Sequence, residues 1–71
     1  MKIKDLLKLF YSDVYFGIRI IDHEQVTLCQ EVTTAERFMD NHKHYCNYEI
    51  EEIEVGDKEV IFHVKGENIN A

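Results

Sequence analysis

One stretch decides the fold of this chain: residues 48–64, YEIEEIEVGDKEVIFHV. Two runs rich in β-forming residues flank the glycine and aspartate at 56–57, and a glycine at the first central position suits a type II′ turn. The stretch therefore predicts a β-hairpin. A two-residue turn at this point places Glu54 directly opposite Glu59.

The same register also predicts an irregularity in the first strand of the hairpin. Continued without a break, it puts Glu51 opposite Phe62 and leaves a carboxylate on the apolar face. One extra residue at positions 51–52, a β-bulge, restores Ile50 against Phe62 and Tyr48 against Val64. We therefore expect a bulged hairpin with one apolar face and one acidic face.

The N-terminal half predicts a helix followed by a second hairpin. Apolar residues recur with helical spacing over 3–10. From Val14 the apolar period changes to two, which predicts a strand, and residues 26–32 predict its partner. Pairing Ile20 with Val26, and Ile18 with Leu28, aligns the apolar residues and leaves a connection over 21–25.

A second helix is predicted between the hairpins. Thr33 with Glu36 three residues later forms a capping box, so the helix should begin there and end near Asn41. Its apolar stripe is Ala35, Phe38, Met39 and His42. The resulting αββαββ order predicts an α+β domain over 1–66, with a frayed polar tail over 67–71. We expect a four-stranded, mainly antiparallel sheet with both helices on one face.

The composition limits the classes of partner. The 71 residues carry a formal net charge of −6 and 45% apolar residues, which is enough for one small core. Negative charge disfavours direct binding to nucleic acid or to anionic membranes, so a protein partner should be neutral or basic. No apolar run reaches membrane-spanning length, which predicts a cytoplasmic protein with reduced cysteines. No cofactor is predicted.

The acidic residues of the second hairpin are the first candidate site. Carboxylates two residues apart on a strand form a row that imitates phosphates or docks on a basic surface. The alternative is a solvated face that keeps sheets from joining edge to edge. The candidate residues are Glu49, Glu51, Glu52, Glu54 and Glu59.

A weaker pattern suggests a metal site. If residues 42–46 are extended, His42, His44 and Cys46 point to one side and offer three zinc ligands. The fourth ligand would have to come from His23, Cys29 or His63. The alternative is a helix C-terminus, where histidines favour the negative end of the dipole. No metal is favoured on this pattern.

Residues on or beside the predicted second face of the sheet form a candidate protein interface. Tyrosine and arginine are enriched at the centres of interfaces, and a homodimer is one assembly that such a surface allows. The candidate residues are Tyr11, Tyr15, Arg19, Ile21 and Ile61. Whether they form one patch depends on the strand order.

The chain offers no pattern typical of an enzyme. Ser12 is its only serine, neither cysteine has a context that activates a thiolate, and no glycine-rich phosphate loop is present. We therefore expect no catalysis.

The opening residues 2–10, KIKDLLKLF, followed after a short turn by Asp13-Val14-Tyr15, resemble the start of many short orphan proteins encoded by phages and mobile elements of Gram-positive bacteria. The resemblance covers about the first twenty residues and carries no catalytic motif. Some small acidic phage proteins bind and inhibit host defence or transcription machinery. The resemblance thus implies an accessory role through protein contact.

Taken together, the sequence predicts a non-catalytic cytoplasmic module that binds protein. One alternative is an acidic mimic of nucleic acid that inhibits a basic host protein. The other is a small domain stabilised by zinc.

Overall fold

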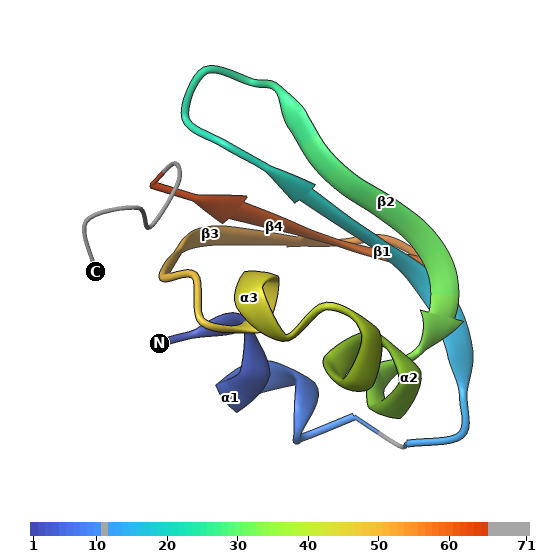
Figure 1. The fold of residues 1–71 in the computed structure, drawn as a ribbon. Helices are drawn as coiled ribbons and strands as arrows, with labels where there is room; N and C mark the ends of the chain where they lie inside the picture. Colours follow the sequence, from blue (N-terminus) through green and yellow to red (C-terminus); the bar gives the residue numbers. More distant parts are fainter. Residues whose placement is uncertain (11, 66–71) are drawn as a thin grey trace.

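A four-stranded sheet forms one layer of the molecule and three short helices form the other (Figure 1). The computed structural model describes residues 1–10 and 12–65. The elements are α1 (Ile3–Leu7), β1 (Tyr15–Ile21), β2 (Thr27–Thr34), α2 (Ala35–Asn41), α3 (Lys43–Cys46), β3 (Ile50–Val55) and β4 (Glu59–Val64). The predicted α+β class and both hairpins are confirmed. The predicted tail over 67–71 lies outside the described residues.

The strands follow the order β2-β1-β4-β3, and the two central strands run parallel. The prediction of a mainly antiparallel sheet is therefore wrong, because the sheet is mixed. The reason is the helical connection α2–α3, which returns the chain to the end of the sheet where β2 began. As a result β3 runs in the direction of β2, and β4, which turns back, runs parallel to β1.

The helical connection also contains an element that the sequence did not predict. Helix α2 ends at Asn41 as expected, but residues 43–46 form the separate helix α3. The N-cap of α2 is Thr34 rather than Thr33, since the Thr34 hydroxyl accepts a hydrogen bond from the Arg37 amide at 3.1 Å. The observed order is αββααββ.

The β3–β4 hairpin has the predicted bulge and a different register. The shift lies between Ile50 and Glu52, as expected, but Val55 now faces Val60, and Glu54 faces Ile61 instead of Glu59. The turn is wider than two residues, because the strands are joined by 56–58 and the Gly56 amide donates to the Glu59 carbonyl at 2.8 Å. Moving the register by two residues leaves each side chain on its predicted face.

The predicted register of the β1–β2 hairpin is wrong. Ile20 faces Cys29 and Ile18 faces Glu31, with a register shift next to Ile21. One cause is the turn, in which the Asp22 carboxylate accepts hydrogen bonds from the amides of Glu24 at 2.9 Å and Val26 at 3.0 Å. Val26 is therefore part of the connection between β1 and β2 and does not pair with Ile20.

The other cause is a bulge at Leu28. Ile21 faces Thr27 while Ile20 faces Cys29, so Leu28 is the extra residue on β2. Beyond that point Cys29 and Glu31 face the helices, and Val32 faces away from them with 74% of its surface exposed. The structure thus reverses the predicted orientation of β2.

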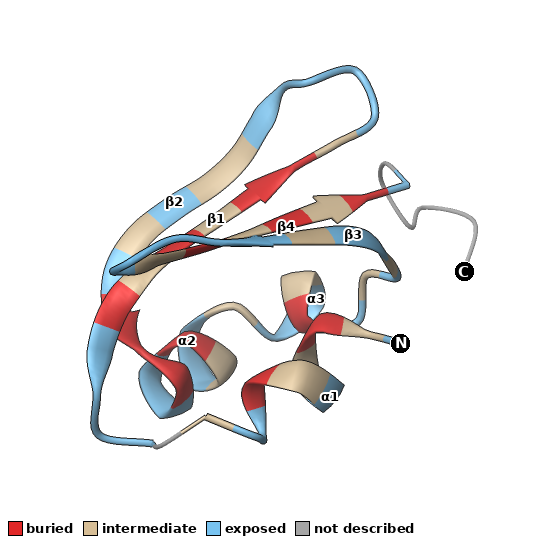
Figure 2. Ribbon diagram, turned by 180° about the vertical axis from the view of Figure 1, so that it is seen from behind, coloured by how far each residue is buried: buried red, intermediate tan, exposed pale blue. Residues whose placement is uncertain are grey.

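The core lies between the sheet and the helices (Figure 2). Its centre is formed by β1 and β4, against which α1, α2 and α3 each place buried side chains. The N-terminal segment is fixed beside the start of β3, because the Ile3 amide donates to the Tyr48 carbonyl at 3.1 Å. The largest fully buried residues are Phe38, Phe62, Ile3, Leu7, Ile18, Ile20 and Val64.

The cap of α2 gives a test of this arrangement. Thr34→Ala removes the acceptor of the Arg37 amide and should lower the free energy of unfolding by about 1 kcal/mol, whereas Thr34→Ser should keep most of it. Urea denaturation followed by circular dichroism measures both variants. Equal losses in the alanine and serine variants would contradict the assignment of Thr34 as the cap.

Candidate functional site

The sheet face opposite the helices is here called the open face, because no described helix covers it (Figures 1 and 2). Residues paired across neighbouring strands share a face, so the registers define which side chains belong to it. They include Tyr15, Arg19 and Ile21 of β1, Gln30 and Val32 of β2, Glu52 and Glu54 of β3, and Glu59, Ile61 and His63 of β4.

The strand order brings most of the predicted interface residues together. Because β1 lies beside β4, Arg19 faces Ile61 directly. Tyr15 belongs to the same face, and Tyr11 lies outside the described residues. Ile21 is also on this face but is only 9% exposed, since Thr27 and His63 flank it on the two neighbouring strands. The expectation that Ile21 offers a contact surface is therefore wrong.

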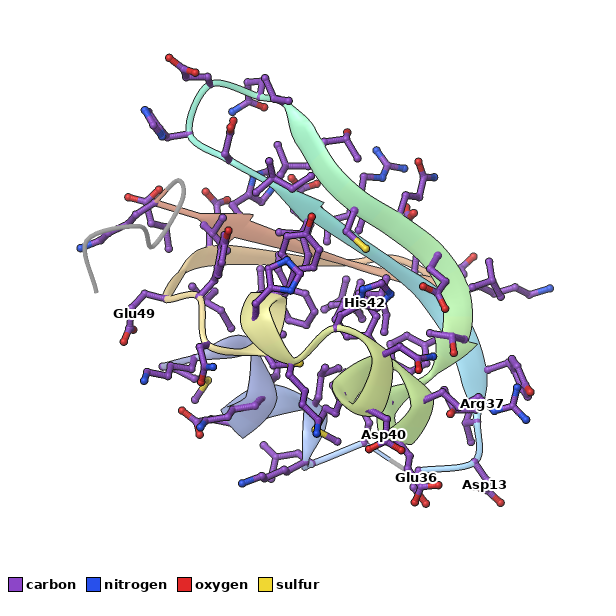
Figure 3. All side chains as sticks on the ribbon, in the orientation of Figure 1. Asp13, Glu36, Arg37, Asp40, His42 and Glu49 are labelled. Carbon is purple, nitrogen blue, oxygen red and sulfur yellow. The ribbon has the colours of Figure 1, made fainter. Side chains whose placement is uncertain are left out.

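Two apolar side chains project from the open face. Val32 is 74% exposed, and Tyr15 is 58% exposed. The guanidinium carbon of Arg37, from α2, lies 5.8 Å from the centroid of the Tyr15 ring, within the range of a cation–π contact. Figure 3 shows Arg37 beside Asp13 and Glu36 at this end of the molecule. The sequence did not indicate Val32, because its position depends on the bulge at Leu28.

An ion pair occupies the centre of the open face. Arg19 Nη2 donates to Glu59 Oε2 at 3.1 Å and to Oε1 at 3.2 Å, and both side chains are about one-third exposed. Gly17 makes room for this pair, since a Cβ at that position would lie 3.3 Å from Glu59 Cγ. Among the described residues, the buried Arg19 Nε has no hydrogen-bond partner. The open face therefore combines apolar surface with a partly desolvated charge pair.

The acidic residues do not form the predicted continuous row. Glu59 pairs with Arg19, and Glu54 Oε1 lies 2.6 Å from His63 Nε2. Glu49 pairs with the amino group of Met1 at 3.2 Å. Glu51 lies in the bulge, and Glu52 shares the open face with Glu54. Since Glu54 faces Ile61, Glu54 and Glu59 are not directly opposite one another as predicted.

The predicted metal-binding trio is not brought together. Residues 43–46 form α3 instead of an extended segment, and side chains two residues apart on a helix point in different directions. Cys46 is buried at 4% exposure, while His44 is exposed. His42 instead turns to β2, where its Nε2 lies 2.7 Å from Glu31 Oε1.

Both cysteines have an environment that disfavours the thiolate. Burial raises the pKa of Cys46, and the Lys4 ammonium group offsets part of that effect. Burial also raises the pKa of Cys29, and the negative charge of Glu31 raises it further. Both shifts favour the protonated thiol over the nucleophilic thiolate.

The helical layer carries charge of the opposite sign to that of β3. A surface pocket of about 270 Å³ lies beside the side chains of Met39, Cys46 and Asn47, and three lysines complete its lining. These are Lys4, Lys8 and Lys43. The molecule is thus acidic along β3 and basic at this pocket, despite its negative net charge.

Comparisons of the chain with protein-family models, with curated proteins and with solved structures gave no match. None of the helices among residues 1–10 and 12–65 is long and apolar enough to cross a membrane.

The ion pair at the centre of the open face predicts a difference between two acidic residues. Glu59→Gln removes the charge that faces the Arg19 guanidinium and should cost about 1 kcal/mol of folding free energy. Glu51→Gln, in the exposed bulge, should change it by less than about 0.5 kcal/mol. Urea denaturation of both variants checks this difference, and equal effects would contradict it.

The raised pKa of Cys29 gives a chemical test. Glu31→Gln removes a negative charge, so the Cys29 pKa should fall and more thiolate should be present at a given pH. We expect faster alkylation of Cys29 by iodoacetamide, measured in a Cys46→Ala background with a chelator present. Glu36→Gln on α2 serves as the control. An unchanged rate in Glu31→Gln would show that Glu31 does not influence this thiol.

Proposed function

We propose that this protein is a small non-catalytic module that binds another protein through the open face. The observation that carries the proposal is the exposure of Val32 and Tyr15 on a sheet face that no described helix covers. Single exposed apolar residues are common, but these two accompany Ile61 and a partly desolvated arginine on one surface. Aromatic residues and arginine are the side chains that protein interfaces favour.

The chemistry of the face points to a neutral or basic partner. Its centre is balanced, because Arg19 and Glu59 neutralise one another. Glu52 and Glu54 border it on β3 and add negative charge at that side. A partner with apolar surface opposite β1 and β2, and with basic residues opposite β3, would complement it. The proposal includes a cytoplasmic location and the accessory role that the N-terminal resemblance implies.

A second copy of the chain is one protein that the open face can contact. Sheets pack face to face at about 10 Å, and a balanced charge pair at the centre does not oppose such packing. The acidic border on β3 would then have to be offset between the two copies. Sedimentation equilibrium of the wild-type protein distinguishes this homodimer from a complex with a different protein.

The nucleic-acid mimic draws less support from the structure. Glu59 already pairs with the Arg19 guanidinium, and Glu54 with the His63 imidazole. Glu49 pairs with the N-terminal amino group. Glu51 and Glu52, which also belong to the predicted acidic site, remain exposed at the start of β3. Binding through these carboxylates would weaken strongly in salt, whereas binding through apolar contacts would not.

Two valines provide a matched pair for the test. Val32 on the open face is 74% exposed, and Val55 at the end of β3 is 75% exposed but shares the side of the sheet that faces the helices. Tagged wild-type protein, Val32→Lys and Val55→Lys are used for capture from a lysate of the cells that encode the protein, at low and high salt.

Val32→Lys should abolish partner capture or self-association, because it places a charge in the contact, and Val55→Lys should not. Circular dichroism establishes that both variants are folded. Equal capture by all three proteins would contradict the proposal. Capture that survives Val32→Lys and is lost in high salt would favour the acidic mimic.

A further inference from the structure

The side of β2 that faces the helices presents two residues with ligand chemistry. Cys29 and Glu31 are two positions apart on the strand, so both side chains point to the helical layer. His42, labelled in Figure 3 at the C-terminal end of α2, reaches the same place, since its Nε2 lies 2.7 Å from Glu31 Oε1. The thiol sulfur, a carboxylate oxygen and an imidazole nitrogen lie within 4.8 Å of one another.

This geometry is close to that of a zinc site. Zinc is bound tetrahedrally by sulfur at about 2.3 Å and by nitrogen or oxygen at about 2.0–2.2 Å, which places neighbouring donors roughly 3.3–3.6 Å apart. The donors in this structure lie within 4.8 Å of one another, and His42 Nε2 lies 2.7 Å from Glu31 Oε1. We expect side-chain rotations to bring this set to the required spacing.

The surroundings hold the ligands in place. The His42 ring lies 4.7 Å from the Phe38 ring and 5.9 Å from the Tyr45 ring, which restricts its rotation. Tyr45 is itself fixed by a 3.0 Å hydrogen bond from its hydroxyl to the Leu28 carbonyl. All three ligand residues are partly buried, so the cluster is only partly solvated and an ion can still reach it from solvent.

Electrostatics also favour a cation here. Glu31 and a Cys29 thiolate would place two negative charges side by side, because the donor atoms of both residues lie within 4.8 Å of each other. A divalent cation between them removes this repulsion. A glutamate that points inward from an edge strand can also serve to prevent edge-to-edge pairing of sheets. That role would explain Glu31, but it would not explain why the Cys29 thiol lies beside it.

We propose that Cys29, Glu31 and His42 bind a zinc ion, with a water molecule as the fourth ligand. Binding releases the thiol proton of Cys29 to solvent, so that a sulfur–zinc bond replaces the S–H bond. Zinc binds a neutral imidazole through Nε2, so the hydrogen between His42 Nε2 and Glu31 Oε1 is lost to solvent, and the ring keeps or takes up one hydrogen on Nδ1. This site would tie the edge strand β2 to the end of α2. It is independent of the protein-binding proposal, because Val32 points to the opposite side of β2.

Cobalt(II) provides a spectroscopic test, since it occupies zinc sites and gives a near-ultraviolet charge-transfer band when a thiolate binds it. Full-length reduced protein, freed of metal with a chelator, is titrated with cobalt and then with zinc. We expect one cobalt per chain, the thiolate band, its loss on adding zinc, and a zinc-dependent rise in melting temperature.

Variants identify the ligands. Cys29→Ser and His42→Gln should each weaken zinc binding by at least about 10–100-fold, the loss that removal of an outer-shell partner already causes. His42→Gln keeps a group able to hydrogen-bond with Glu31, so a lost band there is not explained by loss of that contact. His44→Gln and Cys46→Ala are the matched controls and should bind as the wild type does.

Three results would overturn the proposal. Cobalt binding without a thiolate band would exclude Cys29, and a band lost in Cys46→Ala rather than Cys29→Ser would assign the thiolate elsewhere. Equal binding by the wild type, Cys29→Ser and His42→Gln would show that the ion binds adventitiously. Circular dichroism of each variant separates a lost site from a lost fold.

Discussion

The parallel pairing of β1 with β4 is the constraint on which the rest of the structure depends. It joins two hairpins into one sheet and pairs Ile18 with Val60 and Ile20 with Phe62 beneath the helices. A 2.7 Å hydrogen bond from the Gly17 amide to the Lys58 carbonyl closes its first rung. The same pairing sets Arg19 beside Ile61 and next to Glu59 on the other face. The pairing of β1 with β4 thus positions both the core residues and the residues of the open face.

The bulge at Leu28 has a comparable influence on β2. Because successive side chains of a strand alternate, one inserted residue exchanges the two faces of everything beyond it. Here the exchange turns Val32 outward and turns Cys29 and Glu31 toward His42. A valine on the open face and a ligand cluster under the edge strand therefore have one origin. The two proposals nevertheless concern opposite sides of β2, and neither requires the other.

The sequence predicted those features that depend on local signals. The spacing of Ile3, Leu6, Leu7 and Phe10 predicted a helix over 3–10, and α1 covers Ile3–Leu7 of it. The alternation in β1 predicted its buried face. The bulge near Glu51 also followed from the residue pattern alone, because an unbroken register would place the Glu51 carboxylate on the apolar face of the hairpin. The strand order did not follow, since two separate hairpins can meet through either of their edges. Only the path of α2–α3 across the sheet decides this, and that path is a property of the whole domain.

The register of β2 could not be predicted from the sequence for a different reason. Aligning Leu28 with Ile18 maximises apolar pairing, and nothing in the residue types indicates that Leu28 is the bulged position. The Asp22 turn and the Thr34 cap fix the two ends of the strand, and the bulge takes up the difference. The short helix α3 was missed because KHYC has no apolar periodicity of its own. That error placed His42, His44 and Cys46 on one side of an extended segment.

Nuclear Overhauser effects between backbone protons of the labelled protein test the central claim most directly. The structure predicts parallel-strand contacts that run in the same order along 17–21 and 59–63, together with contacts that place Ile20 opposite Cys29. Antiparallel contacts between β1 and β4 would contradict the sheet order and separate Arg19 from Ile61. Contacts of Ile20 with Val26 or Leu28 in place of Cys29 would contradict the bulge, returning Val32 to the core and moving Cys29 away from His42.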